Sequence, residues 1–93
     1  MKQGQYYDAI WKYHHALGLC HQWGLIKEMA VLHGNTAQAC LKMGDGFNPM
    51  DSPPQMAIWY MEGYKHACGS IQLDPGSDIV YKVGYQCNLT LKV

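Results

Sequence analysis

The sequence contains no arginine, and charge of either sign is scarce, since charged residues make up 15% of the 93-residue chain. Seven lysines balance seven acidic residues, so the formal net charge at pH 7 is zero. Nucleic-acid-binding proteins need clustered positive charge, and arginine is the side chain best suited to bind phosphate through two parallel hydrogen bonds. We therefore expect no nucleic-acid partner.

Long apolar runs are also missing. No stretch approaches the roughly 20 consecutive apolar residues that a membrane-spanning helix needs. The first ten residues, MKQGQYYDAI, carry one lysine followed by polar residues instead of an apolar segment, so they do not resemble a secretory signal. We expect no membrane span and predict a location in the cytoplasm or the nucleus.

Cysteines are few and widely spaced. Cys20, Cys40, Cys68 and Cys87 include no CxxC pair and no close neighbours. Small secreted domains that depend on disulfides have denser cysteine patterns. The 48% share of hydrophobic residues is sufficient for a packed core, so we predict one small domain with reduced, mostly buried thiols.

Apolar residues recur at the i, i+3, i+4 spacing of amphipathic helices, which predicts an all-α fold of about four helices. The first segment covers residues 5–22 and closes with the glycine of HQWG. Its inner stripe is Tyr6, Ala9, Ile10, Tyr13, Ala16, Leu17 and Cys20. The second segment covers residues 25–43, and we expect Gly44 to end it because glycine commonly terminates helices.

A loop rich in turn-forming residues, DGFNPMDSPPQ, follows the second segment. Ser52 can cap the next helix, and Pro53 or Pro54 suits its first turn. This third segment covers about residues 54–73. Its larger apolar residues share one face: Ile58, Met61, Tyr64, Cys68 and Ile71.

Glycine and turn residues punctuate the second half of the chain. Gly63 and Gly69 each weaken a helix by roughly 1 kcal/mol relative to alanine, so they suggest either close contact between helices or simply a marginal helix. The motif LDPGSD ends the third segment, and Ser77 or Asp78 can cap a fourth over about residues 79–92. DIVYKV alone is compatible with a strand, but no partner strand is evident, so we predict a helix.

Three segments share a template of small and aromatic residues at fixed spacing. GQYYDAIWKYHHAL resembles the second helix of a tetratricopeptide repeat, and LHGNTAQACLKMGD resembles the first helix of the next repeat, with Ala37 at the helix crossing. YMEGYKHACGSIQLDP resembles that repeat's second helix, with Gly63 and Ser70 at the small positions and Pro75 as the terminal proline. The turn between the last two segments is longer than the family's two or three residues.

The resemblance implies a helix-turn-helix solenoid of the tetratricopeptide type. Residues 5–22 would be the second helix of repeat one, residues 25–75 would be repeat two with a loop insertion at 45–54, and residues 78–92 would be the first helix of repeat three. Such solenoids usually need about three repeats. We therefore expect a truncated form, a fragment or an isoform, or a piece that completes its surface with a partner or through self-association at its open ends.

In this family the first helices of the repeats line a concave groove that binds peptides or partner helices. The resemblance therefore implies a protein-binding adaptor or scaffold. The implied peptide-binding residues are Asn35, Gln38, Lys42, Lys82 and Gln86. Val31, Gly34, Ile79 and Val83 would lie on the same faces.

VLHGNTAQACLK further resembles the co-chaperone subgroup, which grips the acidic C-terminal tail of the large heat-shock chaperones. Asn35 would help to hold the terminal carboxylate, because amide and ammonium donors suit that group. The subgroup's clamp also needs a lysine and an arginine at the positions of Ile79 and Val83. Lys82 is one residue away, a rotation of about 100° around the helix.

A small metal or redox protein that uses cysteine and histidine is the alternative from another class. His14 and His21 are seven residues apart, as are His33 and Cys40, which corresponds to about 10 Å of helical rise. This is too far for two ligands of one ion, so we predict no metal, no other cofactor and solvated surface histidines. No phosphate-binding loop, paired carboxylates or nucleophile motif is present, so we predict no catalytic residue and no enzyme.

Overall fold

The computed structural model describes residues 3–47, 50 and 53–91. These residues form four α-helices and no strand: α1 (Gln3–Trp23), α2 (Ile26–Asp45), α3 (Pro53–Leu73) and α4 (Asp78–Leu91). The all-α, four-helix prediction is confirmed, including the helical state of DIVYKV in α4. Both prolines that were expected in the first turn of the third helix lie there, whereas Ser52 is outside the described residues.

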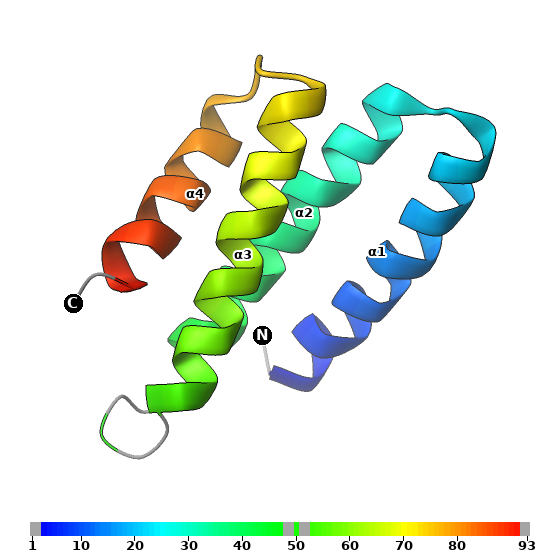
Figure 1. Cartoon of the computed structure of the whole chain (residues 1–93). Helices are drawn as coiled ribbons and strands as arrows, with labels where there is room; N and C mark the ends of the chain where they lie inside the picture. Colours follow the sequence, from blue (N-terminus) through cyan, green and yellow to red (C-terminus); the bar gives the residue numbers. More distant parts are fainter. Residues whose placement is uncertain (1–2, 48–49, 51–52, 92–93) are drawn as a thin grey trace.

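The helices run alternately up and down as consecutive hairpins (Figure 1). α2 is the central element, since it packs against α1, α3 and α4. Among the described helices, the backbone of α1 approaches only α2, and α4 packs against α3 and α2. α1 and α4 therefore lie on opposite sides of the α2–α3 pair, and each leaves its outer face open.

Glycine ends α1 as the sequence predicts. Gly24 has a φ of 67°, in the left-handed region that suits glycine. The Leu25 amide donates to the Cys20 carbonyl at 2.9 Å, and the Gly24 amide donates to the His21 carbonyl at 3.3 Å. This pair of hydrogen bonds is the Schellman motif, which satisfies the last carbonyls of a helix. The chain can thus reverse within two residues and lay α2 against α1.

A serine cap begins α4, as predicted. The Val80 amide donates to Ser77 Oγ at 3.4 Å, which satisfies one of the free amides of the first turn.

Gly44 does not end α2, contrary to the sequence expectation. The helix continues to Asp45, and Gly46 follows it with an ordinary right-handed φ of −78°. Gly44 is buried beneath the ring of Tyr60, where a Cβ atom would lie 2.7 Å from a ring carbon. The Tyr60 hydroxyl donates to Asp45 Oδ1 at 2.7 Å. The glycine therefore provides room for an aromatic ring from α3 instead of a turn.

The buried face of α3 is made of small residues, together with Tyr60. Ala67 is fully buried and Ser70 is 2% exposed. Most of the larger apolar residues that share the predicted face are on the outside, because Ile58, Met61 and Tyr64 are exposed, whereas Ile71 is half-buried against the core. Small side chains occupy the buried face because they let the backbones of neighbouring helices come close.

Gly63 lies where α3 meets both α2 and α4. A Cβ atom at this position would be 2.8 Å from Cys87 Sγ and 3.3 Å from the Ala37 carbonyl oxygen. Two turns further on, Ser70 Oγ donates to the Ala30 carbonyl at 2.7 Å and joins α3 to α2. The close helix contact predicted from Gly63 is confirmed.

The first helix is less buried than its predicted stripe suggests. Of the seven residues in that stripe, only Ile10 is buried, and the others are half-buried. The reason is that α1 has a single backbone neighbour, so its inward face is covered from one side. The thiols are likewise mixed, since Cys40 and Cys87 are buried while Cys20 and Cys68 are half-buried.

Candidate functional site

Three of the five predicted peptide-binding residues lie together on one face of α2. Asn35, Gln38 and Lys42 line a hollow of about 250 Å³ between α2 and α1. The wall contributed by α1 consists of Tyr6, Ala9 and Tyr13. Asn35 is half-buried, and Gln38 and Lys42 are exposed. This hollow therefore offers two amide groups and one ammonium group beside two aromatic rings.

The same face of α2 borders a second hollow, of about 210 Å³, on the side of α4. Asn35 and Gln38 belong to both hollows, and Ile79 forms part of the second. Val31, exposed on α2, lines it as well. The two amide side chains thus stand on a ridge between two depressions, one toward α1 and one toward α4. We refer to this surface as the α2 face.

The remaining predicted groove residues have other positions. Lys82 and Gln86 are exposed on α4 but line neither of the two hollows. Val83 is 8% exposed and belongs to the core, so its assignment to the groove surface is wrong. Gly34 is buried, and a Cβ atom there would lie 2.9 Å from Val80 Cγ2. Both residues are used for packing α4 against α2.

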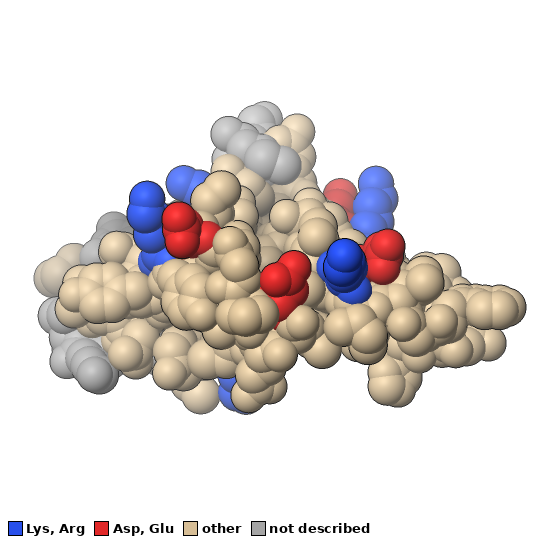
Figure 2. Space-filling view, turned by 90° about the horizontal axis from the view of Figure 1, so that it is seen from above, with Lys and Arg blue, Asp and Glu red and all other residues tan. Residues whose placement is uncertain are grey.

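Charge is dispersed over the face of the molecule that Figure 2 shows. Figure 2 shows lysine and acidic side chains interspersed among uncharged residues, without a large area of one sign. The salt bridge between Lys65 and Glu62 is 3.9 Å long and exposed, which makes it weak. The face shown in Figure 2 therefore offers no extended field of one sign.

Three histidines from three helices form a cluster that the sequence did not reveal. His33 Nδ1 and His66 Nδ1 are 2.9 Å apart, and the rings of His14 and His66 have centroids 5.2 Å apart. His33 and His66 are half-buried, so the prediction of solvated surface histidines is wrong for these two. His15 and His21 are exposed, as predicted. We call His14, His33 and His66 the histidine cluster.

Burial keeps His33 and His66 uncharged. The pKa of His66 is lowered to about 4, chiefly by loss of hydration and then by positive charge on His33 and on His14. The pKa of His33 is lowered too, first by burial and then by His14. A hydrogen bond between two imidazole nitrogens needs one donor and one acceptor, so at least one ring must be neutral. At pH 7 the contact between His33 and His66 is thus a hydrogen bond between two neutral rings.

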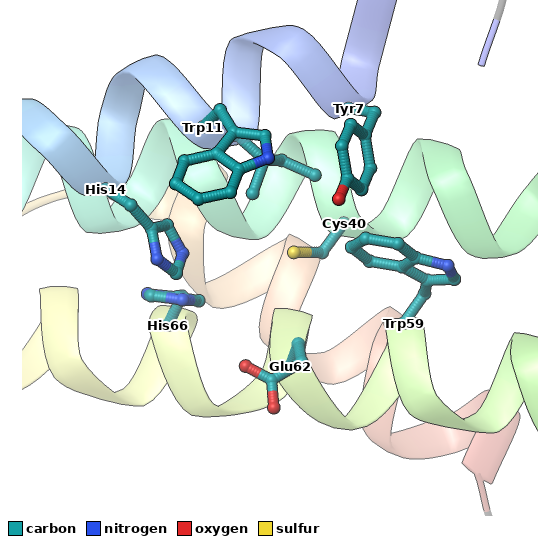
Figure 3. Close-up of a pocket in the computed structure, with 8 residues that line it drawn as sticks. Tyr7, Trp11, His14, Cys40, Trp59, Glu62 and His66 are labelled. Atoms are coloured by element: carbon teal, nitrogen blue, oxygen red, sulfur yellow. The ribbon is translucent and has the colours of Figure 1, made fainter. Parts of the chain in front are cut away.

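Beside the histidine cluster is an apolar hollow of about 240 Å³, which we call the aromatic hollow. α1 supplies one wall, α3 the opposite wall, and Cys40 of α2 lies between them (Figure 3). Its lining residues are Tyr7, Ile10, Trp11, His14, Cys40, Trp59, Glu62 and His66. The Tyr7 and Trp59 rings meet edge to face, with centroids 6.3 Å apart and planes at 83°.

The residues of the aromatic hollow do follow a helical pattern in the sequence. Tyr7, Trp11 and His14 are spaced i, i+4, i+7, and Trp59, Glu62 and His66 are spaced i, i+3, i+7. Each set therefore occupies one face of its helix. The spacing could have indicated two aromatic faces, but not that they oppose each other.

The buried thiols are held in their protonated form. Burial raises the pKa of Cys40 to about 12, with smaller contributions from Glu62 and Cys87. Burial also raises the pKa of Cys87 to about 11, with a contribution from Asp45. Thiolates are the reactive and metal-binding form of cysteine, so this environment disfavours both roles at these two positions. Within residues 3–47, 50 and 53–91, no three histidine, cysteine, aspartate or glutamate residues are arranged to hold a metal ion.

Comparisons with protein families, curated proteins and solved structures give no match to this chain. None of the described helices is long and apolar enough to cross a membrane.

Proposed function

We propose that this chain is a protein-interaction module of the tetratricopeptide type, an adaptor or co-chaperone-like scaffold without catalytic activity. Its ligand would be an extended peptide or a partner helix bound along the α2 face. The observation that carries the proposal is the shared position of Asn35 and Gln38 between two adjacent hollows. Consecutive hairpins with α2 exposed between α1 and α4 support it, because helical-repeat proteins bind ligands on such continuous surfaces.

The chemistry of the α2 face suits a peptide. An amide side chain both donates and accepts hydrogen bonds, so Asn35 and Gln38 can pair with the N–H and C=O groups of an extended backbone. The hollow toward α1 has the rings of Tyr6 and Tyr13 for an apolar side chain. Lys42 adds one positive charge, which favours an acidic residue or a terminal carboxylate in the ligand.

An acidic C-terminal peptide, of the kind carried by large heat-shock chaperones, is the first ligand to test. Asn35 and Lys42 could hold its carboxylate from one hollow. The lysine and the arginine that the co-chaperone clamp also needs have no counterpart here, because Ile79 and Val83 stand at their positions, and Val83 is buried. We therefore expect weaker binding than a complete clamp would give.

The test is an amide NMR titration of the isotope-labelled protein with this peptide. We expect shifts centred on Asn35, Gln38 and Lys42, and their loss in an Asn35→Ala/Gln38→Ala variant. Gln72→Ala is the matched control, because Gln72 is exposed on α3 outside both hollows. If the peptide, and a set of neutral and basic peptides after it, left the α2 face unshifted, the proposed function would be refuted.

Self-association through the open ends is a second proposal with its own observation. Trp23, near the end of α1, is 73% exposed, and Tyr85 on α4 is 68% exposed. Two outer helices that each display large aromatic rings are suited to stack on another copy. Sedimentation velocity over a range of concentrations tests this. We expect a dimer that Tyr85→Ser weakens, and a monomer at every concentration would contradict the proposal.

A further inference from the structure

We propose that the aromatic hollow between α1, α2 and α3 binds an alkylated ammonium group, such as that of choline or of a methylated lysine side chain. This site is separate from the α2 face, since the two sets of lining residues have no member in common.

The walls of the hollow are aromatic faces and edges contributed by two helices. Tyr7 and Trp11 project from α1 toward α3, and Trp59 rises from α3 toward them (Figure 3). Trp11 is 64% exposed and Tyr7 is 47% exposed, although large aromatic side chains usually gain stability from burial. Cations are attracted to the negative faces of such rings, most strongly to tryptophan. A cation bound among these three rings would cover Trp11 and Tyr7, and this would explain why the fold itself leaves both rings exposed.

The electrostatics of the hollow favour a positive ligand. Glu62 brings a carboxylate to the lining, and no lysine lines the hollow. The only ion pair of Glu62 in the described part of the chain is the weak, exposed contact with Lys65. The imidazole of His66 is neutral at pH 7 because burial lowers its pKa. A ligand cation would therefore meet one anionic group and no competing lysine.

Size and polarity select the kind of cation. A volume of about 240 Å³ is below the roughly 300–1,000 Å³ of pockets for drug-sized ligands, so the hollow suits a compact head group. A bare ammonium ion is strongly hydrated, and a guanidinium ion needs acceptors for five N–H groups. A single carboxylate among aromatic rings cannot replace either set of hydrogen bonds. Methyl groups on the nitrogen remove this requirement and retain the charge.

The three tryptophans provide a direct readout. Trp11 and Trp59 line the hollow, whereas Trp23 is at the end of α1 and outside it. The chain should therefore give three indole N–H signals in a nitrogen-correlated NMR spectrum. The titration with choline is done at a pH above the ordinary imidazole pKa of about 6.5. We expect it to shift the signals of Trp11 and Trp59 and leave that of Trp23 in place.

A neutral isostere separates charge from shape. In 3,3-dimethylbutan-1-ol, carbon replaces the nitrogen of choline, so the ligand keeps its shape and loses its charge. We expect choline to bind at least about three-fold more tightly, which corresponds to the weaker end of cation–aromatic interactions. Equal shifts with both ligands would overturn the proposal, because the hollow would then recognise only apolar shape.

Two variants test the residues assigned to the site. Glu62→Gln removes the charge with little change in shape and should weaken choline binding about three- to ten-fold. Trp11→Leu should abolish it, and the exposure of Trp11 makes this change compatible with folding. Glu28→Gln is the matched control, because Glu28 is exposed in the first turn of α2 and does not line the hollow. Unchanged binding in Glu62→Gln would overturn the charge assignment.

A peptide with one trimethyllysine distinguishes the two sources of the group. Shifts of Trp11 and Trp59 with the trimethylated peptide, and not with its unmodified form, would support a partner side chain as the ligand. Shifts with choline alone would support a free small molecule. Absence of shifts with both choline and the methylated peptide would overturn the proposal, and leave the α2 face unaffected.

Discussion

Alanine in place of Gly63 puts a methyl group at the point where α3 crosses α2 and α4. The new Cβ atom would lie 2.8 Å from Cys87 Sγ and 3.3 Å from the Ala37 carbonyl oxygen. Cys87 is fully buried, so its sulfur cannot move out into solvent, and the carbonyl belongs to the backbone of α2. Helix α3 or α4 must therefore shift to accept the methyl group.

Two opposing effects determine how much Gly63→Ala changes the free energy of unfolding. Alanine in a helix interior is favoured over glycine by up to about 1 kcal/mol. Overpacking a close-packed interior costs about 1–3 kcal/mol. We expect Gly63→Ala to lower the free energy of unfolding by about 0–2 kcal/mol. Gly18→Ala in α1 is the matched control, because a Cβ atom there meets nothing within 4 Å, and it should raise that free energy by up to about 1 kcal/mol.

Urea unfolding followed by circular dichroism measures both variants. Their difference of about 1–3 kcal/mol isolates the cost of overpacking, since the helix preference is common to both. Combining Gly63→Ala with Cys87→Ala removes the nearest atom and should recover at least about 0.5 kcal/mol relative to additivity. If Gly63→Ala stabilised the protein as much as Gly18→Ala does, the close approach of α3 to its neighbours would be refuted.

Three further measurements address polar contacts. Because the pKa of His66 falls to about 4 on folding, the unfolded chain binds more protons below about pH 6.5. The free energy of unfolding should therefore decline by about 1–2 kcal/mol as pH falls from about 6.5 to 4, after allowance for solvent screening. His66→Asn should reduce this dependence on pH. A variant that lost as much stability as the unchanged protein over this range would contradict the role of His66. Tyr60→Phe should cost about 1–2 kcal/mol in urea unfolding, because the hydroxyl's hydrogen bond to the Asp45 carboxylate is lost. Ser70→Ala should cost about 1 kcal/mol for its buried hydrogen bond to α2, whereas no change would indicate an unimportant contact.

The helices and most of their ends could be predicted because they depend on local chemistry. Helical periodicity located the first three elements, and the lack of a partner strand identified the fourth as a helix. Gly24 ended α1, and Ser77 capped α4. Gly44 was misread because a glycine that makes room for a ring looks the same in sequence as one that makes a turn. Only the position of Tyr60, on another helix, distinguishes the two.

The buried side of α3 could not be chosen from hydrophobicity. Its large apolar residues and its small residues both repeat with helical period, and several of the large ones, such as Ile58 and Met61, are exposed. Burial there is decided by how closely α2 and α4 approach, which is a property of the assembled helices. Gly63 was the correct local signal, because glycine weakens a helix, so its presence in a helix interior can indicate that a neighbouring helix comes too close for a side chain.

The candidate sites differ in how much of each could be predicted from the sequence. Asn35, Gln38 and Lys42 belong to one helix, so their common face follows from spacing alone. Lys82 and Gln86 required knowledge of how α4 sits on α2. The aromatic hollow and the histidine cluster join α1 to α3 through side chains that are far apart in the chain. The sequence indicates each half, and packing alone brings the halves together.

The single-sided attachment of α1 has a consequence for cooperativity. Among the described helices, the backbone of α1 touches only α2, and Ile10 is the one buried residue among residues 4–23. α1 therefore has the fewest contacts to break when part of the molecule opens. Its amides should exchange with solvent through an opening that costs less than global unfolding, while α2, α3 and α4 stay folded. One wall of the aromatic hollow leaves with α1. Any ligand held there would slow this exchange in proportion to its occupancy, so hydrogen exchange in α1 would report on binding at a distance from the bound group itself.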